Sequence, residues 1–161
     1  MEYSDIYDSR HKRTGRQMVR GEAIRENDYI QASAAVVICD GYILVTRRHP
    51  DKKNGGKWEF PGGGSSAGED GEATLYRELE EETGICPYKE QIKFLKTVFY
   101  EPYHLFMEVY LVEAEVTLKD LSLQESEITQ AMFVTQQELE LMLAALTDLD
   151  KQIYQEIKEL L

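Results

Sequence analysis

Apolar residues along the chain fall into short runs separated by glycine-rich and charged segments, a pattern that predicts an α+β fold. Residues 31–39 are small and apolar at nearly every position, which is typical of a central strand buried on both faces. Asp40-Gly41 is a strong signal for a two-residue hairpin turn, so residues 42–47 are expected to return as the partner strand. Further strands are predicted over residues 93–100, 104–115 and 131–134.

The first 28 residues are polar and charged and predict a leader that precedes the core. Strand-like pieces at residues 5–8 and 17–20 lie on either side of Lys12-Arg13-Thr14-Gly15, so we expect a hairpin that turns there. Residues 29–161 would then form the core. A chain of 161 residues is long enough for one domain with a sizeable core, so we expect a single domain over residues 1–161.

Two helices are predicted near the end of the chain. The first, over residues 136–145, follows Thr135, which has Glu138 three residues later, as in a capping box. The second, over residues 147–160, carries apolar residues at helical spacing, which predicts packing against the core. These apolar residues are Leu149, Ile153, Ile157 and Leu160.

Acidic residues are most concentrated near residues 70–83, which predict another helix that ends at Gly84. Seven carboxylates and one arginine lie between Glu69 and Glu82. At about 100° per residue, Glu81 and Glu82 lie within about 60° of Glu78, so these three carboxylates project from one face. Hard divalent cations such as Mg²⁺ are bound by a few such carboxylates together with phosphate oxygens of a substrate. The cluster therefore predicts a metal site.

Leu75 and Leu79 lie on the neighbouring stripe of the same helix, so the carboxylates stand at the edge of a buried face. A run of charge by itself is more often the solvated face of an acidic helix. The spacing in this segment is regular: Gly63 is followed after five residues by Glu69. After seven more residues the chain reads Arg-Glu-Leu-x-Glu-Glu-x-Gly-Ile and ends the pattern at Ile85.

The segment Gly63–Ile85 resembles the signature box of the Nudix hydrolases and matches all of its specified positions. The resemblance implies a Nudix-type α/β/α sandwich with a mixed β-sheet. It also implies a Mg²⁺-dependent enzyme, with Mn²⁺ as a substitute, that acts on a small-molecule diphosphate substrate. The resemblance leaves a homodimer open.

The resemblance assigns Glu78, Glu81 and Glu82 as metal ligands, with a backbone carbonyl of the glycine run at Gly63 as a further ligand. The same glycines could equally form an ordinary tight turn. Arg77 is offset by about 100° from Glu78, so it should lie outside the centre of the cluster. In the family the equivalent arginine orients the glutamates by ion pairing. Glu69 is expected to cap the helix or to reach the metal through water.

Substrate-binding residues are sought among the cations and aromatic residues near the box. Arg47, Arg48 and Lys57 are the nearest cations, and the two arginines leave their strand in opposite directions, so at most one faces the site. Trp58 and the aromatic group Phe99, Tyr100 and Tyr103 could stack on a nucleobase or sugar, or could belong to the core.

Candidates for the general base lie in the box and in a later loop. Family members commonly use a glutamate from a loop before the last strand, and here that loop contains Glu125 and Glu127. Glu78 is the alternative base. We favour Glu127 for general-base catalysis and keep the other two open.

Composition limits the partners. The chain has 18 Lys and Arg residues against 30 Asp and Glu residues, a net charge of −12, and no basic cluster for nucleic acid. No apolar run approaches about 20 residues and no signal peptide opens the chain, so we expect no membrane partner and a cytoplasmic location. Cys39 and Cys86 form no CxxC pair, and Cys39 is expected to be buried.

The interpretation that these features favour is a Mg²⁺-dependent hydrolase that cleaves a diphosphate linkage in a nucleoside diphosphate joined to another group. One alternative is an isopentenyl-diphosphate isomerase, because residues 5–8, 14–16 and 20–22 resemble the leader of an isomerase-like Nudix subgroup. The chain has no cysteine motif in the needed loop, which disfavours isomerisation. The other alternative, a catalytically silent nucleotide sensor, is disfavoured because no glutamate of the box is missing.

Overall fold

Strand β3 (Ile30–Cys39) is the centre of the sheet in the computed structural model, which describes residues 1–161. It pairs in parallel with β8 (Leu105–Glu113), from Ile30 opposite Leu105 to Ile38 opposite Glu113. β7 (Ile92–Tyr100) pairs antiparallel with β8 and forms one edge of the sheet. The predicted central strand and the predicted hairpin at its C-terminal side are both present.

The other side of β3 is shared by two strands. β4 (Tyr42–Arg48) pairs with β3 only next to the Asp40-Gly41 turn, at Ile38 and Cys39. Nearer the N-terminal end of β3, residues 32–34 pair with the short strand β6 (Gly62–Gly64). The remaining strands, β5 (Trp58–Glu59) and β9 (Ile128–Val134), both pair with β4. Sharing β3 in this way brings the glycine run of β6 beside the central strand.

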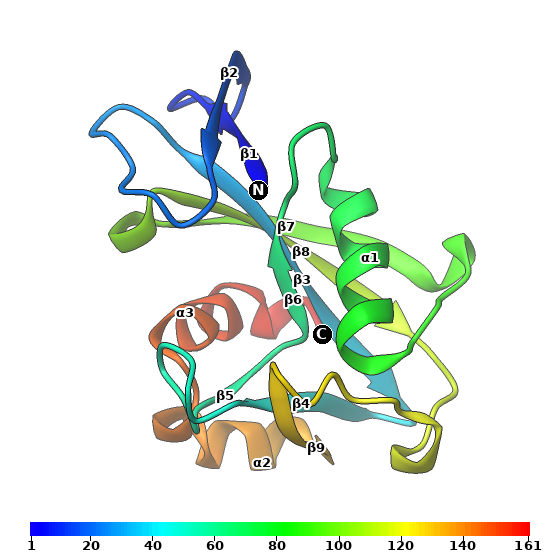
Figure 1. The fold of residues 1–161 in the computed structure, drawn as a ribbon. Helices are drawn as coiled ribbons and strands as arrows, with labels where there is room; N and C mark the ends of the chain where they lie inside the picture. Colours follow the sequence, from blue (N-terminus) through cyan, green and yellow to red (C-terminus); the bar gives the residue numbers. More distant parts are fainter.

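Helices cover both faces of this mixed sheet (Figure 1). α1 (Gly71–Thr83) lies on one face, and α2 (Gln136–Leu141) and α3 (Asp148–Ile157) lie on the other. Successive residues of β3 point to opposite faces, so the strand contributes to both cores. Ala34 and Val36 belong to the core with Ile153 and Ile157, and Ala35 and Val37 belong to the core with Leu75 and Leu79. The predicted α/β/α sandwich is confirmed.

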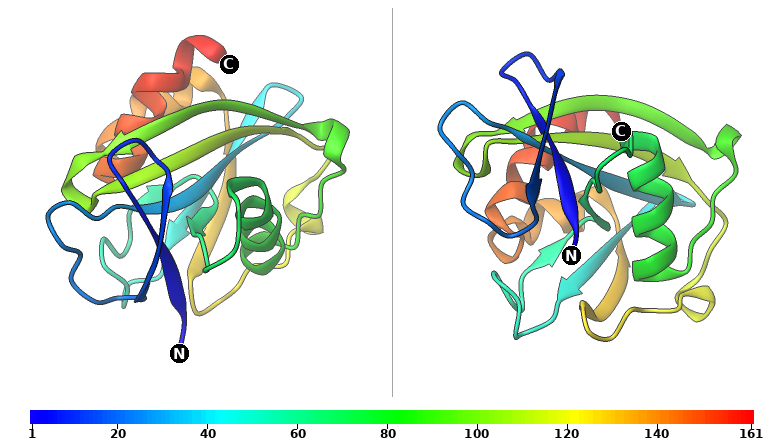
Figure 2. Two further views of the ribbon diagram at one scale, coloured as in Figure 1. Left: turned by 90° about the horizontal axis from the view of Figure 1, so that it is seen from above. Right: turned by 45° about the horizontal axis from the view of Figure 1, so that its top comes forward.

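The N-terminal leader forms a separate two-stranded sheet of β1 (Tyr3–Tyr7) and β2 (Arg13–Val19). The predicted turn at residues 12–15 is wrong, because Asp8 closes an earlier one by accepting hydrogen bonds from the amides of Arg10 and Lys12 at 2.8 and 3.0 Å. The hairpin crosses one end of the main sheet beside the loop that leads into α1 (Figure 2). There the amide of Ala67 donates to the carbonyl of Tyr3 at 2.8 Å.

The C-terminal helices are shorter than predicted. α2 begins after Thr135, whose hydroxyl accepts from the amide of Glu138 at 3.1 Å, as the capping pattern predicts. Single 3₁₀ turns follow both helices, at Leu143–Ala145 and Lys158–Leu160. The last turn leaves Leu160 50% exposed, so its predicted burial is wrong.

Other short segments complete the chain. Cys39 is half-buried rather than fully buried, because it lies at the end of β3 beside the turn. Three further 3₁₀ turns occupy Lys89–Gln91, Glu101–Tyr103 and Leu118–Asp120. No helix has both the length and the apolar character that crossing a membrane requires.

Candidate active site

Helix α1 has clear signals at both ends. Asp70 caps its start, because its carboxylate accepts from the amide of Ala73 at 2.8 Å, and Gly84 ends it in the left-handed region with φ 77°. Capping by Glu69 is therefore wrong. Leu75 and Leu79 are fully buried against the sheet. The packing of these two leucines sets the rotation of the helix and thus the direction of its carboxylates.

The three clustered carboxylates have different environments. Glu78 and Glu82 are only 8% and 6% exposed, whereas Glu81 is exposed. Glu78 lies against β6, where a Cβ added at Gly63 would stand 2.5 Å from its carboxyl carbon. Glycine at position 63 thus lets the carboxylate lie directly on the backbone. This close approach is a requirement for glycine that a tight turn alone does not explain.

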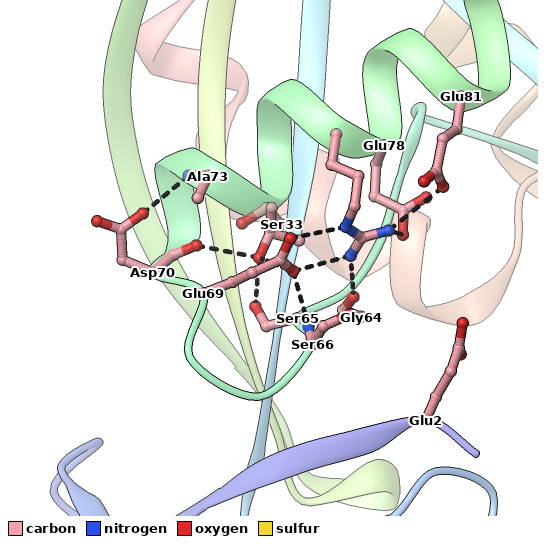
Figure 3. A network of polar contacts seen from close by, with 12 residues as sticks. Glu2, Ser33, Gly64, Ser65, Ser66, Glu69, Asp70, Ala73, Glu78 and Glu81 are labelled. Carbon is pink, nitrogen blue, oxygen red and sulfur yellow. Dashed lines mark hydrogen bonds and ion pairs between the residues drawn. The ribbon is translucent and has the colours of Figure 1, made fainter.

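Arg77 contacts several of these groups, and Figure 3 shows how Glu69, Glu78 and Gly64 lie around its guanidinium. Its guanidinium donates to both carboxylate oxygens of Glu69, at 2.7 and 2.9 Å, and to Glu78 at 2.8 Å. It also contacts Glu81 at 3.3 Å and donates to the carbonyl of Gly64 at 2.9 Å. Arg77 is thus ion-paired with Glu69, Glu78 and Glu81, as the resemblance implies for the equivalent arginine.

A cavity of about 540 Å³ opens beside this network and has no hydrophobic residue in its lining. Six carboxylates and four cationic side chains line it, an excess of two negative charges. The carboxylates are those of Glu2, Glu59, Glu78, Glu81, Glu82 and Glu127, and the cations are Arg20, Arg48, Lys52 and Arg77. Figure 3 shows the side chain of Glu2 extending toward α1, and Glu2 is one of the lining residues.

Burial and nearby negative charge raise the pKa values of two glutamates in this cavity. The pKa of Glu82 is raised well above its ordinary value, first by burial and then by the nearby charges of Glu59 and Glu78. Burial also raises the pKa of Glu59, against the opposing effect of Arg48, whose guanidinium lies 2.8 Å from the carboxylate. An added cation would relieve both effects.

Donor chemistry and charge therefore fit a divalent metal, because the carboxylate oxygens are hard ligands and acidic side chains outnumber cationic ones in the lining. The side chains do not form a ready ligand shell, since no three acidic, histidine or cysteine side chains converge on one point. Glu78 is paired with Arg77, Glu59 with Arg48 and Glu127 with Lys52. Binding a metal would require some of these pairs to rearrange.

A second cavity, of about 740 Å³, adjoins the acidic one, and 11 of its 27 lining residues are hydrophobic. Its apolar wall includes Ile24 of the leader, Ile30 of β3, Leu105 and Met107 of β8, and Leu149 of α3. The two cavities share five lining residues: Arg20, Arg48, Glu59, Gly62 and Gly63. They form a site with one charged half and one half that has an apolar wall, and the latter is called the apolar half below.

Only one of the predicted basic residues faces this site. Arg48 lines both cavities, whereas Arg47 points away and donates to the carbonyl of Gly56 at 2.9 Å and to Gln130 at 2.8 Å. Lys57 donates to the carbonyl of Ala144 at 2.9 Å and lines neither cavity. The opposite directions of the two arginines follow from strand alternation, as predicted.

The aromatic residues divide in a similar way. Trp58 packs against the larger core beneath the guanidinium of Arg47, which lies 6.0 Å from its ring centroid. Neither it nor the pair Phe99 and Tyr100 lines the site, whereas Tyr103 lines the larger cavity. The structure therefore leaves Tyr103 as the member of this group that can reach a ligand.

The two loop glutamates lie in different places. Glu127 lines the acidic cavity and pairs with the ammonium group of Lys52. Glu125 is exposed and lines neither cavity. Of the three residues considered as the base, Glu78 and Glu127 face the same cavity.

Sequence reasoning missed Glu59, Lys52 and Arg20. Glu59 lies two residues before Pro61, and strand alternation turns it away from Trp58, a signal that could have been used. Lys52 and Arg20 lie in segments with no regular pattern, and no local signal places either of them near α1.

The fold and the site together define an α/β/α sandwich with an acidic cleft beside a ligand-sized cavity. Residues 30–157 match the family model of the NUDIX domain, so the chain belongs to the Nudix family of hydrolases. It is 30% identical over 146 residues to an uncharacterised Nudix hydrolase of Listeria monocytogenes, a match that covers 87% of this chain and 83% of the relative.

Solved structures share the fold. The crystal structure of DR0079 from Deinococcus radiodurans superposes with a TM-score of 0.79 at 23% identity and covers 96% of this chain and 98% of that one. The NUDIX domain of NrtR from Shewanella oneidensis, complexed with ADP ribose, gives a TM-score of 0.67 at 19% identity. That match covers 88% of this chain and 92% of the other.

Proposed function

We propose that this chain is a Mg²⁺-dependent hydrolase that cleaves the diphosphate linkage of a nucleoside diphosphate joined to another group. The observation that carries the proposal is the junction of the two cavities. A substrate of this class has a charged diphosphate and larger, less polar groups, which correspond to the acidic and the apolar halves of the site. The bound ADP ribose in the NrtR domain is a molecule of the same class.

Glu78, Glu81 and Glu82 would hold the metal, with the backbone of Gly63 beside them. When bound, Mg²⁺, or Mn²⁺ in its place, neutralises phosphate charge and lowers the pKa of water. Arg77 is a positioning residue, because its contacts with Glu69, Glu78 and Gly64 fix α1 relative to the glycine run.

Glu127 would accept the proton of the attacking water, since it lines the same cavity as Glu78, Glu81 and Glu82. Lys52 pairs with Glu127, and both side chains line the acidic cavity. Glu78 is the alternative base, but its carboxylate already accepts from Arg77 at 2.8 Å. Arg48, which lines both cavities, would contact the phosphates.

A hydrolysis screen tests this proposal. The chain is assayed with Mg²⁺ and then Mn²⁺ against nucleotide sugars including ADP-ribose, dinucleotides, damaged nucleoside triphosphates and coenzyme A. We expect phosphate-anhydride cleavage of at least one compound, and a loss of several orders of magnitude in Glu82→Gln, because a carboxylate ligand is removed. Absence of cleavage, or equal rates in Glu82→Gln at saturating Mg²⁺, would refute the proposal.

Isopentenyl diphosphate is added to the same screen to test the isomerase alternative. The two cysteines, Cys39 and Cys86, line neither half of the site, so neither can act on a substrate held there. We therefore expect no isomerisation and full hydrolase activity in the variant with both cysteines replaced by Ser.

A further inference from the structure

The N-terminal leader forms part of the wall of the larger cavity, although it precedes residues 30–157, which match the family model. Met18, at the end of β2, and Ala23 and Ile24, in the segment that follows, add apolar surface. Arg20 from the same stretch lines both the apolar and the acidic cavity. The leader thus reaches the point at which the two halves of the site meet.

Arg20 is held at this point by weak contacts. One guanidinium nitrogen lies 3.3 Å from the carbonyl oxygen of Gly64, and another lies 3.3 Å from the carboxylate of Glu2. The side chain of Glu2 is 72% exposed, so solvent screens the pair and it contributes little stability. A ligand anion can replace Glu2 at low cost.

Gly64 is suited to receive this guanidinium. A Cβ added at position 64 would lie 2.5 Å from the Arg20 guanidinium nitrogen, so any larger residue would push the arginine away from β6. The same carbonyl of Gly64 accepts from Arg77 at 2.9 Å. Arg20 therefore stands next to the network that orients the carboxylates of α1.

The other cations of the site are more firmly engaged. Arg48 is bound to Glu59 at 2.8 Å and to the carbonyl of Lys53 at 2.8 Å. Lys52 is paired with Glu127, and Arg77 contacts three glutamates. Both hydrogen bonds of Arg20 are 3.3 Å long, against 2.8 Å for the two of Arg48, so the protein holds the Arg20 guanidinium more loosely. A guanidinium fork matches two phosphate oxygens.

We propose that the N-terminal hairpin completes the substrate site and that Arg20 binds a phosphate of the diphosphate on the side of the apolar cavity. This inference rests on the proposed function, because that function supplies the diphosphate. It adds a specificity-determining residue from outside the matched domain. Arg20 holds the ligand where the charged and apolar halves meet and takes no part in proton transfer.

The test measures binding of methylenebisphosphonate, a diphosphate analogue without a cleavable P–O–P bond, by isothermal titration calorimetry with Mg²⁺ present. We expect Arg20→Gln to weaken binding by about 10-fold or more, because charge-assisted hydrogen bonds to the anion are lost. Arg20→Lys keeps the charge but not the guanidinium fork, so its affinity for the analogue should lie between those of the unaltered chain and Arg20→Gln. Arg25→Gln is the matched control, since Arg25 is an exposed arginine of the same segment and lines neither cavity.

A purely structural role for Arg20 predicts a different result, namely a lower Tm with unchanged affinity, and would overturn the inference. Failure of the unaltered chain to bind the analogue, or equal weakening by Arg25→Gln, would also overturn it. If Arg20→Gln does not fold, the comparison of Arg20→Lys with the unaltered chain decides. Arg20-dependent binding in a chain that hydrolyses no compound would refute the proposed function but not the binding role of Arg20.

Discussion

Replacing Arg77 by Gln tests the arrangement of charges around α1. The substitution keeps an amide donor but removes the charge and the fork that reaches both carboxylate oxygens of Glu69 at 2.7 and 2.9 Å. It also breaks the contacts with Glu78 at 2.8 Å and with the carbonyl of Gly64 at 2.9 Å. Three acidic side chains then lose their common partner.

The expected size of the effect follows from the exposure of the groups. The side chains of Arg77, Glu69 and Glu78 are 27%, 19% and 11% exposed, so the network lies between a surface pair and a buried one. Exposed pairs contribute up to about 1 kcal/mol, and breaking a buried pair costs about 3–5 kcal/mol. We expect the free energy of unfolding to fall by about 2–3 kcal/mol at pH 7.5 without metal.

The effect should depend on pH. Hydrogen bonding to Arg77 holds the pKa of Glu69 below its ordinary value of 4.5. Because the folded-state pKa is the lower one, the stabilisation is complete above the unfolded-state pKa and is lost as pH falls through the folded-state pKa. The difference in the free energy of unfolding between the unaltered chain and Arg77→Gln should therefore become smaller below about pH 4.

Urea denaturation in the presence of a chelator, followed by the fluorescence of the single tryptophan, Trp58, measures the free energy of unfolding. Repeating it at pH 7.5 and at lower pH gives the size of the loss and its pH dependence. Arg25→Gln serves as a control for the loss of an arginine charge outside the network. The double variant Glu69→Gln/Arg77→Gln should be less destabilised than the sum of the two single variants. A loss under about 0.5 kcal/mol at pH 7.5, or a loss that does not change with pH, would refute the reasoning.

Three further changes test other parts of the site. Glu127→Gln should lower kcat by about 10²–10⁴-fold with little change in Mg²⁺ affinity. Unchanged kinetics would indicate that Glu78 is the base, and an equal loss of Mg²⁺ affinity would indicate that Glu127 is a metal ligand. Asp150 of α3 lines the larger cavity, and its carboxyl group accepts from the amide of Phe60 at 2.9 Å. Burial raises the pKa of Asp150 to about 7 from an ordinary 3.8, so between these values the free energy of unfolding falls as pH rises, by up to about 1.4 kcal/mol per pH unit. Asp150→Asn should reduce that slope in urea denaturation at pH 5 and pH 7, and equal slopes would contradict the assignment. In Gly63→Ala the added Cβ would stand 2.5 Å from the carboxyl carbon of Glu78 and should displace this side chain. We expect hydrolysis to fall by about 10²-fold with an unchanged circular dichroism spectrum. Full activity would show that the close approach of Glu78 to Gly63 is unimportant.

Local features were predicted from the sequence because short-range geometry decides them. The spacing of Glu78, Glu81 and Glu82 places them near one face of any helix, and Gly84 ends α1 because it adopts the left-handed conformation. Asp40 and Gly41, with φ of 50° and 82°, form the expected hairpin turn. The continuous apolar run of β3 likewise predicted a strand with a core on each face.

Strand lengths were less predictable, because a strand extends as far as its partner does. β9 begins at Ile128, three residues before the predicted start, since Arg48 of β4 continues the ladder to that position. The turn of the leader was misplaced because the carboxylate of Asp8 accepts from the amides of Arg10 and Lys12 and so closes a turn before Thr14-Gly15.

The composition of the site was decided by the tertiary structure. Lys52 meets Glu127 across 75 residues, and Arg20 meets Gly64 across 44 residues, so neither contact has a local signature. Packing also decided that Glu78 and Glu82 are buried while Glu81 is exposed. The sequence alone therefore determined the carboxylate helix, because hydrogen bonds between near residues specify a helix, and the central strand β3, because its continuous apolar run does. Only the folded chain determined which cations surround those carboxylates, because such contacts depend on how distant segments pack.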